Sequence, residues 1–246
     1  MSTQLNIGII TQARMTSTRL PGKIFKEINH KKLLQYHIDR LKQTGFDIAI
    51  ATTTNDTDDC VCEFAEQQNI KFHRGSENNV LSRFHETATK FKFDVIIRVT
   101  SDCPLIDPYL IRNSVEKYLQ FNTDHLYLSN VIERTYARGF DYEIFSYQLL
   151  DDAFRNATAE GDLEHVTPYI RENKSRKTDF YFYPVKQHLD NSNFRITVDT
   201  PEDFELIKVL IEKYHADKLS FFEIEEILSE HPELVAINAH IEQKKV

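Results

Sequence analysis

Cysteine is scarce in this chain, and its scarcity excludes a disulfide-stabilised scaffold. The 246 residues contain three cysteines, Cys60, Cys62 and Cys103, an odd number without the regular spacing of a paired framework. We therefore expect reduced thiols and a cytoplasmic protein. The Cys60-Val61-Cys62 segment also lacks the two intervening residues of a redox or zinc pair, so both cysteines are interpreted as ordinary helix residues.

Long apolar runs and flexible linkers are missing from the sequence as well. The first apolar run, residues 5–10, is too short for the core of a secretory leader, and no stretch approaches the length of a membrane span. We expect no membrane partner. Only six glycines occur, and neither a Gly/Ser-rich linker nor an internal repeat divides the chain. These features favour a single domain over residues 1–246.

An excess of positive charge is missing too, because the formal net charge is -8 at pH 7. Nonspecific nucleic-acid binding usually requires a basic face, so we expect no nucleic-acid partner. The histidines show no metal-ligand spacing, and no Gly-x-Ser-x-Gly segment indicates serine hydrolysis. The chain does contain the apolar material for a substantial core, since it is 41% hydrophobic with 17 Phe and 11 Tyr.

Strand and helix patterns alternate along the first half of the chain. The strand patterns cover residues 5–11, 47–53, 70–73 and 95–100, and the helix patterns cover residues 31–44, 57–69 and 80–91. This alternation predicts a mainly parallel sheet covered by helices on both faces. In such sheets, ligands bind at the carboxyl ends of the strands.

The second half is less regular but continues the mixed pattern. Helices are predicted over residues 108–121, 147–156, 163–172, 201–214 and 221–230, and strands over residues 126–131, 140–145, 179–185 and 194–198. The apolar residues of the stretch 221–241 suit a homodimer contact, and they suit a cap on the core equally well.

The segment 13–23, Ala-Arg-Met-Thr-Ser-Thr-Arg-Leu-Pro-Gly-Lys, is the most informative part of the chain. It follows the first strand pattern and contains three cations, three hydroxyl groups and a Pro-Gly turn. Hydroxyl and backbone N–H groups donate hydrogen bonds to phosphate oxygens, and Arg14, Arg19 and Lys23 would neutralise their charge. The segment predicts a polyphosphate-binding loop, and the alternative is a basic surface turn.

Two aspartates directly follow strand patterns. Asp102 precedes a Cys-Pro turn, and Asp199 precedes a helix start in which Thr200, Pro201 and Asp203 fit a capped first turn. Asp199 stands outside that cap and is free to point elsewhere. Mg²⁺ prefers one or two carboxylates together with phosphate oxygens, so the pair predicts a nucleotide–magnesium site. The alternative for Asp102 is a turn-forming residue before proline.

Together these segments resemble the sugar cytidylyltransferases, namely the CMP-KDO synthetase group and the related spore coat polysaccharide biosynthesis protein F family. The resemblance lies in segments 13–23, 102–105 and 198–203, and their order and separation extend it over roughly residues 5–210. It implies the nucleotide-diphospho-sugar transferase fold, a three-layer α/β/α sandwich with a mixed, mainly parallel sheet. It also implies a nucleotide-binding half of about residues 1–120 and an acceptor-binding half of about residues 121–246.

The resemblance carries site residues onto this chain. It implies that the nucleotide, CTP, contacts Ala13, Arg14, Ser17, Thr18, Arg19, Lys23, Thr52, Thr53, Arg83 and Asp102. The catalytic set it implies is Arg14, Lys23, Asp102 and Asp199, of which Asp102 and Asp199 would coordinate Mg²⁺. The acceptor would contact Glu143, Glu164 and His165, and KDO synthetases carry an amide where this chain has His165.

The expected reaction is a magnesium-dependent transfer of CMP from CTP to a sugar acid or related acceptor, with release of pyrophosphate, for cell-surface polysaccharide biosynthesis. One alternative is a glycosyltransferase of similar fold that uses a nucleotide sugar. Such enzymes usually hold their metal with an Asp-x-Asp pair, which this chain does not place at a strand end. Another alternative is a catalytically inactive nucleotide-binding subunit.

Overall fold

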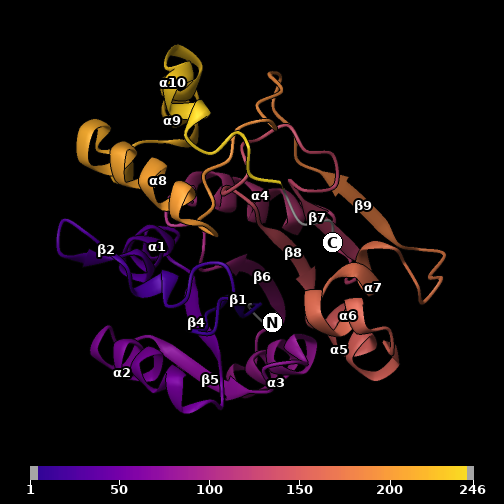
Figure 1. The fold of residues 1–246 in the computed structure, drawn as a ribbon. Coiled ribbons are helices and arrows are strands. Elements are labelled where there is room, and N and C mark those ends of the chain that lie inside the picture. The colour runs from indigo at the N-terminus through magenta and orange to yellow at the C-terminus, as the bar shows by residue number, and fades with distance from the viewer. Residues whose placement is uncertain (1–4, 243–246) are drawn as a thin grey trace.

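A seven-stranded mixed sheet forms the centre of the protein (Figure 1). The computed structural model describes residues 5–242. The strand order is β5-β4-β1-β6-β8-β7-β9. Parallel pairing joins β5, β4, β1 and β6, whereas β8 is antiparallel to both β6 and β7, and β9 is parallel to β7. The strands are β1 (Ile7–Gln12), β4 (Asp47–Thr53), β5 (Lys71–Gly75), β6 (Val95–Thr100), β7 (Leu126–Ser129), β8 (Glu143–Ser146) and β9 (Tyr181–Pro184).

Helices cover both faces of the sheet and complete a three-layer sandwich. Neighbouring strand residues point to opposite faces, so Ile9 belongs to one buried cluster and Ile10 to the other. The first cluster includes residues of α1 (Leu33–Lys42), α2 (Asp59–Gln67), α4 (Pro108–Gln120), α8 (Pro201–Tyr214), α9 (Phe221–Glu230) and α10 (Pro232–Ala236). The second cluster packs under α3 (Val80–Phe91), α5 (Tyr147–Asn156), α6 (Glu160–His165) and α7 (Pro168–Arg171).

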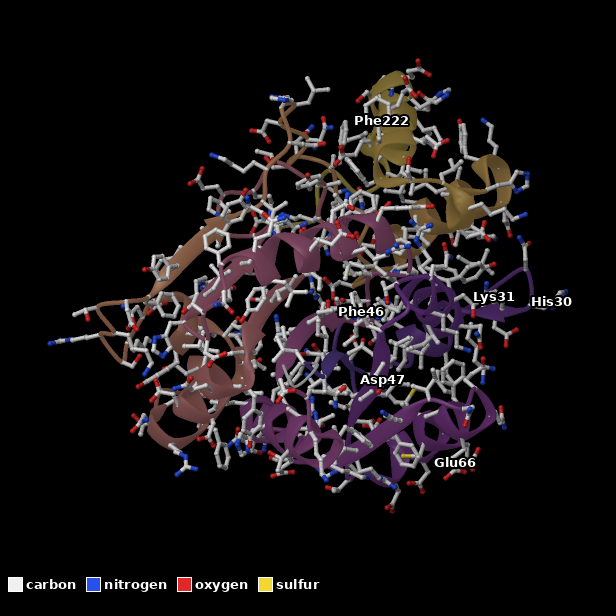
Figure 2. The ribbon with its side chains drawn as sticks, turned by 180° about the vertical axis from the view of Figure 1, so that it is seen from behind. His30, Lys31, Phe46, Asp47, Glu66 and Phe222 are labelled. Atoms are coloured by element: carbon white, nitrogen blue, oxygen red, sulfur yellow. The ribbon has the colours of Figure 1, made fainter. Side chains whose placement is uncertain are left out.

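Short elements complete the chain. The 3-10 turn η1 (Lys23–Phe25) leads into a two-stranded hairpin of β2 (Glu27–Ile28) and β3 (Lys31–Lys32). Figure 2 shows His30 and Lys31 of this hairpin at the margin of the molecule. Two further 3-10 turns, η2 (Asp56–Asp58) and η3 (Ala216–Lys218), precede α2 and α9. No helix within residues 5–242 is long and apolar enough to cross a bilayer.

The apolar residues of the stretch 221–241 mostly cap the core. Helices α8 to α10 gather at the end of the molecule opposite α2 and α3 (Figure 1). There Ile224, Leu228 and Leu234 are buried. Phe222 on α9 is 56% exposed and points outward (Figure 2).

The predicted single helix over residues 163–172 is wrong. The structure has α6 ending at His165 and α7 beginning at Pro168, with Val166 between them at φ 71° and ψ -53°. Proline has no N–H to continue a helical ladder, and a positive φ takes the backbone out of the helical region. The two helices are therefore separate.

The predicted strand over residues 194–198 is also wrong. Only a single bridge, between Arg138 and Arg195, links this segment to a neighbour. The Ile196 N–H donates to the Arg138 carbonyl, but the Val198 N–H donates to the Asp102 carbonyl. Because consecutive bonds go to different segments, no regular ladder forms, although the segment still delivers Asp199 to the sheet edge.

Backbone hydrogen bonds tie the segments after the strands to one another. The Ala13 N–H donates to the Ala51 carbonyl at 3.1 Å, and the Ser101 N–H donates to the Gln12 carbonyl at 3.2 Å. The bond from Val198 to Asp102 measures 2.8 Å. The carboxyl edge of the sheet therefore holds the segments 13–23, 101–104 and 198–203 in one place.

Candidate active site

The two predicted metal-binding aspartates meet at one cation. The ammonium nitrogen of Lys23 lies 3.1 Å from Oδ2 of Asp102 and 2.8 Å from Oδ1 of Asp199. Gly22, at φ 67°, allows the sharp turn that places Lys23 at the start of η1. Residues from three distant parts of the chain thus form one charged cluster, as the sequence predicted.

Charge compensation keeps this cluster ionised. Burial opposes the charged form of Lys23, but the Asp102 and Asp199 carboxylates outweigh it and raise the pKa of the ammonium group. Burial likewise opposes ionisation of Asp102, yet the Lys23 charge and hydrogen bonds lower the pKa of that carboxyl to about 2. At neutral pH the site therefore presents the Asp102 carboxylate beside the Lys23 ammonium group.

The carboxylate pair fits a divalent cation. Both side chains already direct an oxygen at the same positive centre, the Lys23 nitrogen. Among the residues described, no group of three His, Cys, Asp or Glu side chains could hold a metal by itself. Mg²⁺ usually binds one or two carboxylates and takes its remaining ligands from phosphate and water. The pair of Asp102 and Asp199 matches this arrangement.

Two arginines contact Asp199, and the sequence did not predict that they would meet there. Arg19 lies 3.0 Å and Arg195 2.9 Å from Oδ2 of Asp199. Arg195 also pairs with the buried Asp203, which closes a capping box with Thr200 at the start of α8. The sequence predicted the helix cap. It did not predict the role of Arg195, because the partners of Arg195 become neighbours only through the packing of the segment 194–198.

A buried carboxylate that sequence reasoning missed anchors the segment 13–23, the predicted polyphosphate-binding loop, which we call the phosphate loop. Asp58 is fully buried and accepts the Met15 backbone N–H at 2.8 Å. It also accepts the hydroxyl groups of Thr52 and Thr53, at 3.1 and 2.5 Å. Thr52 and Thr53, predicted to line the nucleotide pocket, are themselves fully buried and hold Asp58 in place beneath the loop.

Most of the predicted nucleotide residues line one cavity of about 230 Å³. Its walls include Ala13, Arg14, Ser17, Thr18, Arg19, Lys23, Arg83, Asp102, Asp199, Glu164 and His165. We call it the small cavity. Residues from the phosphate loop, α3, α6 and the two aspartate segments therefore converge on a single space.

Arg83 adds a buried positive charge to the small cavity. Its side chain is buried on α3 and donates from Nη1 to the Ser76 carbonyl at 2.5 Å, while its Nε has no hydrogen-bond partner among the described residues. Burial, and then the nearby Arg14, lower the pKa of its guanidinium to about 10. Arg83 still carries its charge at neutral pH, which favours an anionic ligand.

A second, larger cavity of about 860 Å³ adjoins the first. Thr100 and His165 line both spaces. We call it the large cavity. Its cationic lining residues are Arg98, Arg134, Arg138 and Arg171, and its acidic ones are Asp141 and Glu143. The excess of cations over carboxylates suits a ligand with negative charge.

Both carboxylates of the large cavity are engaged by other side chains. Asp141 accepts two hydrogen bonds from Arg134, at 2.6 and 2.8 Å. Glu143 accepts from Arg98, from Tyr127 and from Thr167. Glu143, predicted to contact the acceptor, thus orients Arg98 and Thr167 at the cavity wall.

The turn after His165 has an uncommon geometry. Val166 adopts φ 71° and ψ -53°, and the Thr167 N–H donates to the His165 carbonyl at 2.8 Å. This is a γ-turn of the rare positive-φ kind, and a β-branched residue in such a conformation costs about 1 to 3 kcal/mol. Val166 is fully buried, so the surrounding packing maintains the turn where the two cavities meet.

The chain is similar to several known proteins over most of its length. The profile of the cytidylyltransferase family matches residues 7–245. An uncharacterized protein of Methanocaldococcus jannaschii, MJ1063, is 34% identical over 240 residues, covering 97% of this chain and 96% of its own. The spore coat polysaccharide biosynthesis protein SpsF of Bacillus subtilis is 34% identical over 215 residues, covering 85% and 87%. A 3-deoxy-manno-octulosonate cytidylyltransferase of Aeromonas salmonicida is 30% identical over 114 residues, 44% of each chain.

Solved structures show the same fold. A cytidylyltransferase from Leptospira borgpetersenii superposes with a TM-score of 0.89 at 32% identity, covering 98% of this chain and 100% of its own. CMP:2-keto-3-deoxy-manno-octonic acid synthetase, complexed with CTP, superposes with a TM-score of 0.60 at 18% identity, covering 85% and 99%. With a family profile over nearly the whole chain and relatives of this similarity, the protein belongs to the cytidylyltransferase family.

Proposed function

We propose that the protein transfers CMP from CTP to a sugar acid or a related acceptor and releases pyrophosphate, in the synthesis of a cell-surface polysaccharide. The observation that carries the proposal is the convergence of Asp102 and Asp199 on Lys23 within the small cavity. The names of the relatives SpsF and 3-deoxy-manno-octulosonate cytidylyltransferase support the acceptor class and the pathway.

The phosphate loop would bind the triphosphate. Arg14, Arg19 and Lys23 line the small cavity, and their charges can stabilise the negative charge that develops on the leaving pyrophosphate. Asp58 keeps the loop in position through the Met15 N–H. Arg83, buried and only partly hydrogen-bonded, also lines the small cavity and can contact the nucleotide there.

Asp102 and Asp199 would hold Mg²⁺. When bound, the ion would polarise the α-phosphate of CTP and so favour attack on phosphorus. Lys23, which lies between the two carboxylates and is the last residue of the phosphate loop, would then turn its charge toward phosphate oxygens. In this arrangement the carboxylates never face each other without a cation.

The large cavity would bind the acceptor. Its surplus of arginines is suited to a carboxylate-bearing sugar, and among residues 5–242 neither Arg138 nor Arg171 forms a salt bridge, although Asp141 acts on Arg138 electrostatically. Since the two cavities share the wall at Thr100 and His165, an acceptor hydroxyl in the large cavity can reach the α-phosphorus of a nucleotide in the small one. Positioning of the two substrates supplies much of the rate enhancement in such transfers.

A pyrophosphate-release screen tests the proposal. The purified protein is incubated with Mg²⁺ and each of CTP, UTP, ATP and GTP, against 3-deoxy-manno-octulosonate, N-acetylneuraminate and neutral sugars. We expect pyrophosphate and a CMP-linked product with CTP and a sugar acid. Release of free CMP or UDP from nucleotide sugars, without use of CTP, would contradict it. Light scattering of the same sample tests the further expectation of a homodimer.

A further inference from the structure

We propose that His165 is the general base of the transfer, accepting the proton of the acceptor hydroxyl as its oxygen attacks the α-phosphorus. The inference rests on the proposed function and assigns a chemical role that family membership does not. In the step, the acceptor O–H bond breaks and its proton moves to an imidazole nitrogen. The oxygen forms a bond to the α-phosphorus, the bond from phosphorus to pyrophosphate breaks, and the imidazolium later releases the proton to water.

The position of His165 is the first support. Its side chain lines both the small cavity, which contains Asp102 and the phosphate loop, and the large cavity, which contains Arg138 and Arg171. A general base must reach the nucleophile at the place where it meets the electrophile. Among the titratable residues on the two linings, only His165 belongs to both.

The engagement of the other candidates is the second support. Asp141 is bound by two nitrogens of Arg134, and Glu143 accepts from three donors. Asp102 and Asp199 are occupied by Lys23 and placed for the metal. A carboxylate whose lone pairs are engaged in ion pairs is a poor proton acceptor.

His165 itself is available for a new hydrogen bond. Its half-buried imidazole makes no hydrogen bond or ion pair with any described residue. Glu164 is the remaining acid near this point, but it is exposed and lines the small cavity alone. Imidazole is also the side chain that most often serves as a general base in enzymes.

The backbone around His165 is the third support. The γ-turn at Val166 directs the chain sharply from the end of α6 into Thr167, whose hydroxyl donates to Glu143 at 2.6 Å. Such turns persist only where packing enforces them, and they concentrate at functional sites. Here the enforced turn fixes the backbone next to His165, whose side chain lines both cavities.

The test compares wild type with His165→Ala and His165→Gln, and uses His30→Asn as a matched control. His30 is an exposed histidine in the β2–β3 hairpin at the margin of the molecule (Figure 2), and asparagine tolerates its positive φ of 60°. The first probe is Mg–CTP with 3-deoxy-manno-octulosonate. The second is Mg–CTP without a sugar acid, which measures the slow background reaction with water. Pyrophosphate release gives kcat and KM, and calorimetry gives the Kd for CTP.

We expect both His165 variants to lose kcat by on the order of 10² to 10⁴ fold, while KM and the Kd for CTP stay near wild type. Added imidazole should partly restore His165→Ala and leave His165→Gln, which fills the space, unrestored. His30→Asn should match wild type. If the kcat-specific loss or the imidazole rescue does not appear, the assignment is overturned. A wild type that binds no CTP and releases no pyrophosphate would instead refute the proposed function.

Discussion

The ammonium nitrogen of Lys23 lies 2.8 Å from Oδ1 of Asp199, a residue 176 positions further along the chain. With Asp102 on its other side, this lysine occupies the point on which both carboxylates converge. A positive charge is therefore part of the site before any substrate binds, which has consequences for metal affinity.

Replacing Lys23 by alanine should separate metal binding from turnover. Without the ammonium group, the two carboxylates repel each other, so a divalent ion is attracted more strongly in the absence of nucleotide. We expect Lys23→Ala to bind Mn²⁺ alone more tightly than wild type in a titration followed by electron paramagnetic resonance. Turnover should fall by on the order of 10² to 10³ fold, since one charged contact to the phosphates is lost.

The matched control for that variant is Lys31→Ala. Lys31 pairs with Asp39 in the hairpin region, at the margin of the molecule in Figure 2. The Lys31→Ala variant should leave both the Mn²⁺ affinity and the turnover unchanged. Equal Mn²⁺ affinity in Lys23→Ala and wild type would show that the lysine does not compete for the carboxylates.

Asp58→Asn should weaken the phosphate loop. The amide keeps one oxygen for the Met15 N–H, but it loses the charge and acceptor capacity that serve Thr52 and Thr53. We expect the free energy of unfolding, measured by urea denaturation, to fall by about 1 to 3 kcal/mol. We also expect a higher Kd for CTP. The neighbouring Asp59→Asn removes an exposed ion pair with Arg74 and should change neither value appreciably.

Gly139→Ala should destabilise the protein at the wall of the large cavity. Gly139 has φ 119°, and an added Cβ would lie 2.9 Å from the backbone carbon of Ile196, which cannot move aside cheaply. We expect a loss of about 2 to 4 kcal/mol, measured by thermal or urea unfolding. Gly161→Ala meets nothing within 4 Å and should be close to neutral. Similar stabilities of the two variants would contradict the tight packing of the segments 138–140 and 194–198.

His37 should make stability depend on pH. It is fully buried, donating from Nδ1 to the Cys103 carbonyl at 2.8 Å and accepting from the Thr11 hydroxyl at 2.9 Å. Burial lowers the pKa of its imidazole from 6.5 to about 4. The unfolded chain therefore binds a proton first as pH falls, so stability should decrease between pH 6.5 and about 4, by about 3 kcal/mol at most.

The comparison variant is His37→Gln, which keeps an amide donor and acceptor but cannot titrate. Its unfolding free energy should be lower than that of wild type at pH 7, and its slope against pH between 6.5 and 4 should be shallower. Parallel slopes would mean that His37 is not the titrating group. Because His37 holds the Cys103 carbonyl, the variant also reports on how firmly the Asp102 turn is fixed.

Local patterns were sufficient to predict most of the fold. The helix over residues 80–91 and the strands over residues 47–53 and 95–100 have the predicted bounds, because their apolar periodicity matches the faces they bury. The family resemblance is confirmed by the cytidylyltransferase profile. The convergence of Lys23 and Asp102 was predicted by placing them after strands at one sheet edge, whereas Asp199 reaches the same edge from a segment that is not a strand.

What escaped prediction depends on tertiary contacts. Asp58 reads as an ordinary residue at a helix start, and its bond from the Met15 N–H forms only when the phosphate loop folds over it, while three more bonds come from Thr52 and Thr53. Val166 lies in a pattern that predicts a continuous helix, and the positive φ that breaks it is imposed by packing. The segment 194–198 alternates like a strand, but its hydrogen bonds go to two different neighbours.

The most direct test of the account is the rate of pyrophosphate release from Mg–CTP by Asp102→Asn, beside the control Asp47→Asn, an exposed residue paired with Lys71 on the face seen in Figure 2. We predict that Asp102→Asn folds normally and loses turnover by at least about 10² fold, because one of two metal-binding carboxylates is gone. Asp47→Asn should match wild type. Near-normal turnover by Asp102→Asn would contradict the assignment of this carboxylate pair to the reaction.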